Sequence, residues 1–108
     1  MYELRTYTAA EGKLSELSDR FRDSTMALFA KHGMQAVGAW IPTDAPRSEN
    51  TLVFLMAWPS REVADSTWKR FIDDPAWKAL VADTEQDGRP WISIDRLWLR
   101  STEYSPTK

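Results

Sequence analysis

Residues 51–58, Thr-Leu-Val-Phe-Leu-Met-Ala-Trp, carry the pattern that decides the fold of this chain. Successive side chains of an extended strand point to opposite faces, and this segment is apolar in both phases. One phase consists of Leu52, Phe54, Met56 and Trp58, and the other of Val53, Leu55 and Ala57. Such a strand is typical of the middle of a sheet that is covered on both faces.

Three further segments have strand patterns. Residues 2–7 alternate between two faces, and residues 34–41 form a largely apolar run that ends at Pro42. The last strand is predicted over 91–100, where the alternation of apolar and polar side chains slips near Asp95-Arg96. Such a slip predicts a β-bulge at that point.

Helices are predicted over two regions. Between residues 11 and 33 the apolar side chains fall within one arc of a helix, and Gly33 ends it as a C-terminal cap. A second helix begins after Ser60, a favourable N-cap residue. Asp74-Pro75 predicts a restart or kink, because aspartate caps helices and proline suits a first turn. The segment 87–90 ends this helix.

The predicted element order is therefore β-α-β-β-α-β. This order is typical of the ferredoxin-like α+β class, in which two helices cover one face of a four-stranded antiparallel sheet. A length of 108 residues suits one domain, so residues 1–108 are interpreted as a single unit with a polar tail from about residue 101.

The apolar second face of strand 51–58 predicts a partner. Two helices cover only one face of the sheet, and a second copy related by two-fold symmetry is the commonest way to cover the other. The sequence therefore predicts a homodimer. The alternative is that this face is ordinary exposed apolar surface.

Composition excludes several kinds of function. The chain has 43% apolar residues, 28% charged residues and a formal charge of -2, with no basic stripe, so we expect a globular protein that does not bind nucleic acid. It has no cysteine and a single histidine, which excludes disulfides and the usual zinc sites, and no metal site is predicted. No signal peptide or membrane span is apparent, so a soluble, cytoplasmic protein is expected.

Several segments, taken in order, resemble the NIPSNAP family. They are Tyr2-Glu3-Leu4-Arg5-Thr6-Tyr7, His32-Gly33, Val37-Gly38-Ala39-Trp40, Asp74-Pro75-Ala76-Trp77 and Tyr104-Ser105-Pro106. The resemblance implies a dimeric α+β barrel, in which two sheets meet face to face and each subunit keeps a small cavity between sheet and helices. Related folds include cofactor-free monooxygenases, haem-degrading oxygenases and isomerases, whereas NIPSNAP members mostly lack an assigned reaction.

His32 is the candidate catalytic residue, because it falls on the apolar arc of the first helix. An inward histidine at this place can act as a general base, ligate haem iron, or hydrogen-bond the last carbonyls of its helix. Small-molecule binding at this place requires no cofactor, and haem held by His32 is the weaker alternative.

Arg5 and Tyr7 are candidate ligand-binding residues on one face of the first strand, suited to an anionic or carbonyl-bearing molecule. A structural ion pair from Arg5 to Glu3 or Asp95 is the alternative. The candidate aromatic lining of the pocket is Trp40, Trp58 and Trp98, with core packing as the alternative. Trp68 and Trp77 are expected in the core.

Two functions remain open on this basis. The first is binding or transformation of a small apolar or aromatic carbonyl-containing molecule in a pocket between sheet and helices. The second is a non-catalytic dimeric interaction protein in which Arg5, Tyr7 and His32 are structural. Haem binding and cofactor-free oxygenation are weaker alternatives.

Overall fold

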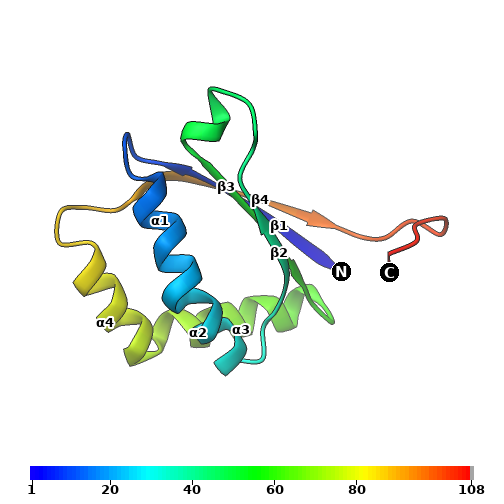
Figure 1. Cartoon of the computed structure of the whole chain (residues 1–108). Helices are drawn as coiled ribbons and strands as arrows, with labels where there is room; N and C mark the ends of the chain where they lie inside the picture. The colour runs from blue at the N-terminus through cyan, green and yellow to red at the C-terminus, as the bar shows by residue number, and fades with distance from the viewer. Residues whose placement is uncertain (108) are drawn as a thin grey trace.

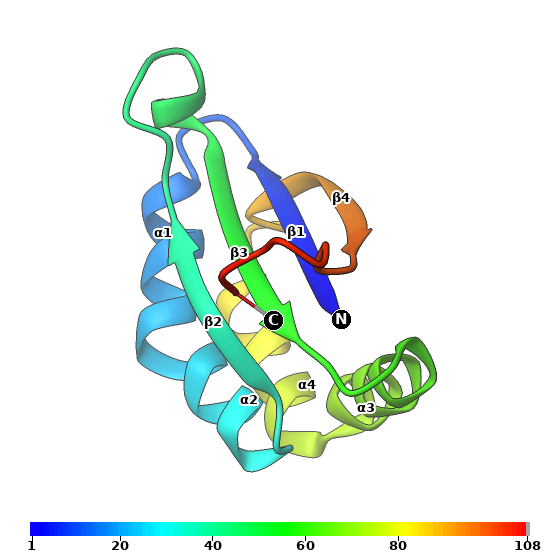
Figure 2. The ribbon, with the colours of Figure 1, turned by 90° about the vertical axis from the view of Figure 1, so that its right-hand side faces the viewer.

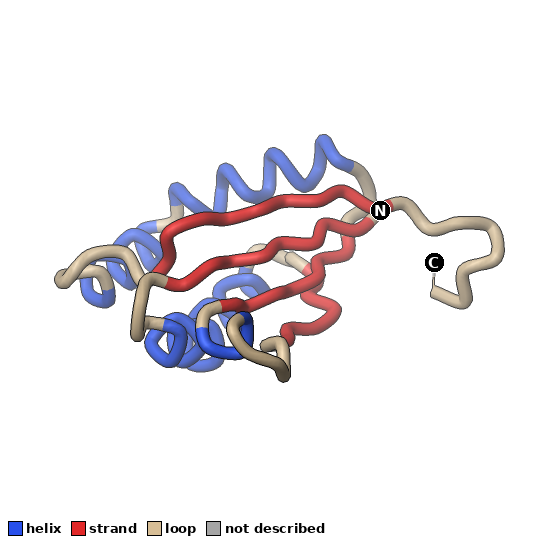
Figure 3. The backbone as a smooth tube through the Cα atoms, turned by 90° about the horizontal axis from the view of Figure 1, so that it is seen from above, coloured by secondary structure: helices blue, strands red, loops and turns tan. Residues whose placement is uncertain are grey.

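The computed structural model describes residues 1–107 and contains one sheet with helices on one side of it (Figures 1 and 3). The strands are β1 (Tyr2–Ala9), β2 (Gln35–Trp40), β3 (Thr51–Ala57) and β4 (Trp91–Leu99). The helices are α1 (Leu14–Arg20), α2 (Met26–Lys31), α3 (Arg61–Asp73) and α4 (Pro75–Thr84), with a π-helical turn at Phe21–Thr25 and a short 3₁₀ turn at Arg47–Glu49. Among residues 1–107, no helix has the length and apolar character needed to cross a membrane.

The sheet has the strand order β2-β3-β1-β4 with every neighbouring pair antiparallel. This order, together with the β-α-β-β-α-β sequence of elements, confirms the predicted ferredoxin-like α+β fold. The strand that is apolar in both phases, β3, lies inside the sheet between β2 and β1 (Figure 2).

The first helical region is continuous but not uniform. Side chains at Leu17, Phe21, Thr25 and Phe29, four positions apart, are all buried. In an α-helix a step of four residues overshoots a full turn by about 40°, so a strict interval of four drifts around the helix. The π-helical turn, in which the Met26 N–H donates to the Phe21 carbonyl, holds more residues per turn and offsets this drift. Gly33 follows the helix with a positive φ of 69°, as a C-terminal glycine does.

The second helical region starts and restarts at the predicted caps. The Ser60 hydroxyl accepts a hydrogen bond from the Val63 N–H at 3.2 Å and begins α3. The Asp74 carboxylate accepts one from the Ala76 N–H at 2.8 Å and begins α4, with Pro75 as its first residue. These capping bonds satisfy N–H groups that have no partner within their helix.

The predicted bulge at Asp95-Arg96 is wrong. Pairing of β4 with β1 runs without interruption through Thr6–Asp95 and Arg5–Arg96, and its irregularity lies at Thr8/Ala9. The alternation slips at Arg96 because this charged side chain points toward the helices, where it pairs with buried Glu3. A charged side chain on the inner face of β4 therefore produced the same sequence pattern as a β-bulge would.

The sheet face away from the helices carries many apolar side chains. Trp40 is 53% exposed and Leu97 56% exposed, beside the half-buried Val53 and Leu55 of the central strand. The Trp40 ring lies over Gly38, where an added Cβ would be 2.8 Å from the ring. The register pairs Trp40 with Val53 and Gly38 with Leu55 on this open face.

The carboxylate of Glu3, which is fully buried, joins β1, β4, α3 and the residue that follows β3 on the face toward the helices. Its Oε1 accepts hydrogen bonds from the indole N–H groups of Trp58 at 2.9 Å and Trp68 at 2.8 Å. Its Oε2 accepts from Arg5 at 3.2 Å and from Arg96. One carboxylate therefore satisfies two indoles and pairs with two guanidinium groups.

A second carboxylate, that of Asp74, ties the end of α2 to the start of α4. Its Oδ2 lies 2.8 Å from Lys31 Nζ and 2.6 Å from His32 Nε2. These hydrogen bonds, led by that of Lys31, hold the pKa of Asp74 well below its usual range.

Replacement of Glu3 by glutamine should destabilise the protein by about 3 kcal/mol, because two guanidinium groups lose their buried counter-charge. The measurement is urea unfolding followed by tryptophan fluorescence. Glu11→Gln, at an exposed position, is the control and should change the free energy of unfolding by less than about 0.5 kcal/mol. An equal effect of both substitutions would contradict the importance of the Glu3 contacts.

Acid should weaken the Asp74 junction. Because the pKa of Asp74 is lower in the folded than in the unfolded chain, its contribution to stability is present above about pH 4 and disappears as the pH falls. Melting temperatures measured from pH 7 to pH 3 should therefore fall less steeply in Asp74→Asn than in the unmodified protein. Asp83→Asn, at an exposed position, should keep the original slope. Identical slopes in all three proteins would rule out this junction as an acid-sensitive contact.

Candidate functional site

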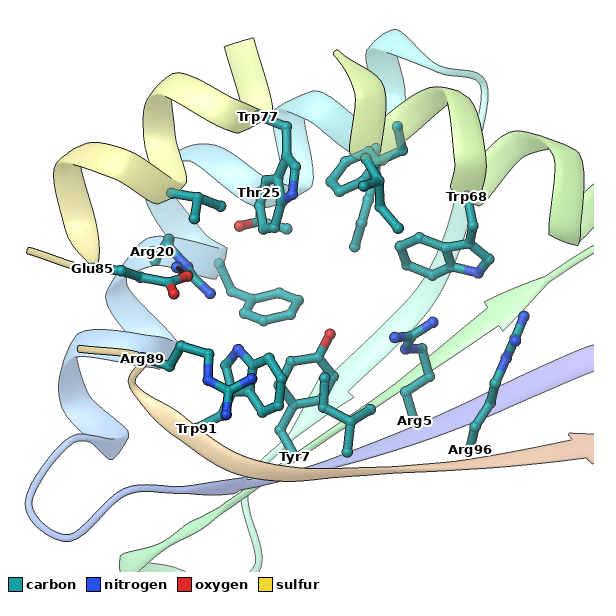
Figure 4. A pocket seen from close by; sticks show the side chains of 16 residues that line it. Arg5, Tyr7, Arg20, Thr25, Trp68, Trp77, Glu85, Arg89, Trp91 and Arg96 are labelled. Atoms are coloured by element: carbon teal, nitrogen blue, oxygen red, sulfur yellow. Dashed lines mark hydrogen bonds and ion pairs between the residues drawn. The ribbon is translucent and has the colours of Figure 1, made fainter. Parts of the chain in front are cut away.

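A cavity of about 510 Å³ lies between the helices and the β1–β4 half of the sheet (Figure 4). Residues of β1 and β4 form its floor, and the helices form its walls and roof. Its aromatic lining consists of Tyr7, Phe21, Phe29, Trp68, Phe71, Trp77 and Trp91. Its aliphatic lining consists of Ile72, Val81 and Ile94. A cavity of this size and composition is typical of small-molecule sites.

Aromatic contacts hold the lining in place. Tyr7 packs edge-on against Phe21 with ring centroids 5.8 Å apart, and it also contacts Trp91 at 6.3 Å. On the helical side, Phe71 lies between Phe29 at 5.2 Å and Trp77 at 4.8 Å. These rings pack against one another around the cavity, so its wall is formed by interlocked side chains.

The charged residues of the lining are mostly basic. They are Arg5, Arg20, Arg89, Arg96 and Glu85. Arg20 pairs with Glu85 at 2.7 Å, whereas Arg5 and Arg96 share Glu3 behind the floor. Arg89 lies at an exposed position with its guanidinium 4.3 Å from the ring centre of Trp91. Arginines thus outnumber carboxylates around an otherwise apolar space.

Tyr7 directs its hydroxyl into the cavity, next to the guanidinium of Arg5 (Figure 4). Burial raises the pKa of Tyr7, although nearby Arg5 and Arg20 oppose this effect. The phenol is therefore neutral at physiological pH and is available as a hydrogen-bond donor. Arg5 also stacks on Trp68, with its guanidinium carbon 4.2 Å from the ring centre.

Three buried polar atoms around the cavity have no hydrogen-bond partner within residues 1–107. They are Thr25 Oγ1, Arg20 Nε and Arg5 Nε, and all three residues line the cavity. Buried polar groups are normally paired, so these three atoms are exceptions, and they mark the polar part of the cavity wall. In this part of the chain, no group of three or more histidine, aspartate or glutamate side chains is arranged to hold a metal ion.

The structure brings together only some of the predicted site residues. Arg5 and Tyr7 both line the cavity. Arg5 also makes the ion pair to Glu3 that was its structural alternative, so it belongs to both arrangements.

His32 is not part of the cavity lining. It lies at the C-terminal end of α2, where its ring packs edge-on against Phe71 and Nε2 is hydrogen-bonded to Asp74. These contacts support a structural role at the junction of α2 and α4. Because Asp74 occupies Nε2, this ring nitrogen is not free to bind a ligand or a metal.

The three predicted pocket tryptophans lie in three different places, and none lines the cavity. Trp40 is on the open face of the sheet, and Trp58 is buried with its indole N–H on Glu3. Trp98 packs between the guanidinium groups of Arg61 and Arg96, at 4.9 and 4.5 Å. The aromatic lining includes Trp68 and Trp77, which also belong to or pack against the core, as expected.

Arg20 and Thr25 are cavity residues that the sequence prediction missed. The available signal was the interval of four residues joining Leu17, Phe21, Thr25 and Phe29, in which one polar side chain interrupts an apolar series. A regular helical projection already places Thr25 between Phe21 and Phe29, about 40° from each. The π-helical turn reduces the drift along this series.

Solved structures of other proteins have the same architecture. Structures of a NIPSNAP family protein of unknown function from Agrobacterium tumefaciens superpose with TM-scores of 0.81 and 0.83 at 19% identity. These alignments cover 97% and 99% of this chain and 96% and 92% of the other. An uncharacterized NIPSNAP domain protein from Burkholderia xenovorans superposes with a TM-score of 0.78 at 20% identity, covering 97% of both chains.

More distant structures share the fold alone. SnoaB, a cofactor-independent oxygenase from Streptomyces nogalater, superposes with a TM-score of 0.58 at 14% identity over 96% of both chains. No match to this chain was found among curated proteins.

The sequence profile of the NIPSNAP family matches residues 2–106, nearly the full length of the described chain. This match and the superpositions agree with the resemblance in the strand and helix-end segments. The chain belongs to the NIPSNAP family.

Proposed function

We propose that this chain binds or transforms a small apolar or aromatic carbonyl-containing molecule in the cavity between its sheet and helices. The observation that carries this proposal is the cavity itself, about 510 Å³ in volume and lined by aromatic rings that pack against one another, with arginine and hydroxyl side chains among them. A few convergent polar groups in an apolar cavity are what orient a small molecule.

Arg5 and Tyr7 are the groups proposed to orient the carbonyl. Both come from the floor strand β1, and both offer N–H or O–H donors. Glu3 fixes the guanidinium of Arg5 from behind, and stacking on Trp68 holds it in plane. Donors held in this way polarise a carbonyl oxygen and stabilise negative charge that develops on it. His32 is proposed to be structural, because Asp74 occupies its Nε2 outside the cavity.

Filling the cavity should abolish ligand binding. Ile94 lines the floor, and a tryptophan at this position occupies space that the ligand needs. We expect apolar ketones (acetophenone, 1-acetonaphthone and 2-decanone) to raise the melting temperature of the unmodified protein, since a ligand that binds only the native state stabilises it. The shift should be absent in Ile94→Trp.

Ile92→Trp is the matched control for this experiment. Ile92 lies on the same strand, is 66% exposed and is outside the cavity lining, so its variant should keep the melting shifts. Absence of any shift in the unmodified protein, or equal shifts in both variants, would overturn the proposed site.

We also propose that the open face of the sheet mediates a homodimer. Support comes from the apolar side chains on this face: Leu4, Trp40, Val53, Leu55 and Leu97. Two of them, Trp40 and Leu97, are more than half exposed in the single chain. Contiguous exposed apolar surface on a sheet is typical of an interface.

A charge on this face should dissociate the dimer. Leu97→Glu places a carboxylate at a position that is 56% exposed in the monomer, so folding should tolerate it while the paired state does not. Sedimentation velocity at micromolar concentration should show the mass of two chains for the unmodified protein and of one chain for Leu97→Glu. Val63→Glu, on the exposed side of α3, should remain dimeric. A monomeric unmodified protein would contradict this proposal.

A further inference from the structure

Two hydrogen-bond donors on the helical wall of the cavity have no acceptor within residues 1–107. Thr25 is 2% exposed and lines the cavity, yet its Oγ1 makes no hydrogen bond within residues 1–107. Arg20, 7% exposed, also lines the cavity, and its Nε has no partner in the same part of the chain. A buried donor without an acceptor is costly, so both groups favour a ligand that brings an acceptor.

The local backbone places these two donors together. Arg20 immediately precedes the π-helical turn and Thr25 ends it. Because bonding in a π-helix links residues five apart, residues 20 and 25 occupy the same side of this segment on successive turns. Figure 4 shows both side chains on the same side of the cavity, near Trp77.

Contacts within the protein fix the orientation of the Arg20 guanidinium. Its Nη1 donates to Glu85 Oε2 at 2.7 Å and to Thr84 Oγ1 at 3.2 Å. These bonds engage one side of the group, and Trp77 lies beside it with its ring centre 5.4 Å from the guanidinium carbon. Nε is buried and makes no hydrogen bond within residues 1–107, and an arginine held in this way can bind a second carboxylate through that side.

The charge around the cavity selects an anion over a neutral acceptor. Four arginines and one glutamate line it, while the buried Glu3 pairs with Arg5 and Arg96 and the exposed Asp65 pairs with Arg96 at 3.3 Å. Arg5, Arg20 and Arg96 have carboxylate partners, so within residues 1–107 the excess positive charge of the lining comes from Arg89. An excess of positive charge in an apolar enclosure attracts a negatively charged group.

We propose that the ligand is a hydrophobic carboxylate whose acid group is held by Thr25 Oγ1 and Arg20 Nε. This inference rests on the proposed function, since it concerns the same cavity. The apolar body of the ligand lies among the aromatic rings, and its other polar end faces Arg5 and Tyr7 on the floor. Thr25 and Arg20 are thus specificity-determining residues that select acids.

The test compares an acid with its neutral amide, which keeps the shape and the carbonyl oxygen. Isothermal titration at pH 7.5 with 1-naphthylacetate and 1-naphthylacetamide, and with decanoate and decanamide, should show each acid binding at least about 10-fold more tightly than its amide, as charge-assisted bonds require.

The variant Thr25→Val removes the hydroxyl while keeping the side-chain shape. It should weaken binding of the acids about 5- to 10-fold and change binding of the amides less than about twofold. Thr43→Val, in an exposed loop outside the cavity lining, should leave both unchanged. Thermal unfolding of each variant verifies that it is folded.

The outcomes separate this inference from the proposed function. If amides bind as tightly as acids, or if Thr25→Val weakens both equally or neither, the acid site is wrong while the ketone results of Ile94→Trp still stand. If acids, amides and ketones all fail to bind the unmodified protein, the cavity is not a ligand site and both proposals fail.

Discussion

The buried carboxylate of Glu3 is the constraint around which this fold and its cavity are arranged. A charge with no access to water is tolerated only when it is fully hydrogen-bonded and paired. Two indoles and two guanidinium groups meet that requirement here, and they come from β1, the residue that follows β3, the edge strand β4 and helix α3. The same contacts hold Arg5 and Trp68 at the edge of the cavity. Stability of the sheet–helix packing and orientation of the candidate site therefore depend on one group.

The cavity exists because the helices do not close completely over the sheet. Near β3 the large apolar side chains of the central strand fill the space, and Phe54 and Met56 are almost fully buried. Toward β4 the floor carries Arg96 and the half-buried Ile94, and the opposing wall is the π-helical turn. The aromatic rings around it meet at edge-on or tilted angles, as Tyr7 does with Phe21 and Phe71 with Trp77. The result is a packed half and an open half beneath the same helices.

Much of the fold followed from local sequence patterns. The two-phase apolar strand, the caps at Ser60 and Asp74 and the stop at Gly33 are short-range signals, and each appears where it was predicted. The site was less accessible, because its members meet only through tertiary packing. That Arg5 and Tyr7 lie together could be predicted, because they share one strand face. The partners of Glu3 could not be predicted without knowing that β4 pairs with β1. Trp40 and Trp58 both stand at the end of a predicted strand, yet they lie on opposite faces of the sheet.

The π-helical turn lets this helix hold one more residue without changing the face that it turns toward the cavity. Four residues of an α-helix turn the chain by about 400°, and a π-helical turn takes about one residue more to reach nearly the same orientation. A relative with one residue fewer between Phe21 and Thr25 would therefore keep both ends of the helix in phase and still present Arg20 and Thr25 on one side. The donors on this wall thus correspond between relatives by their place in the turn, and a gap in an aligned sequence at this helix does not mean a different cavity.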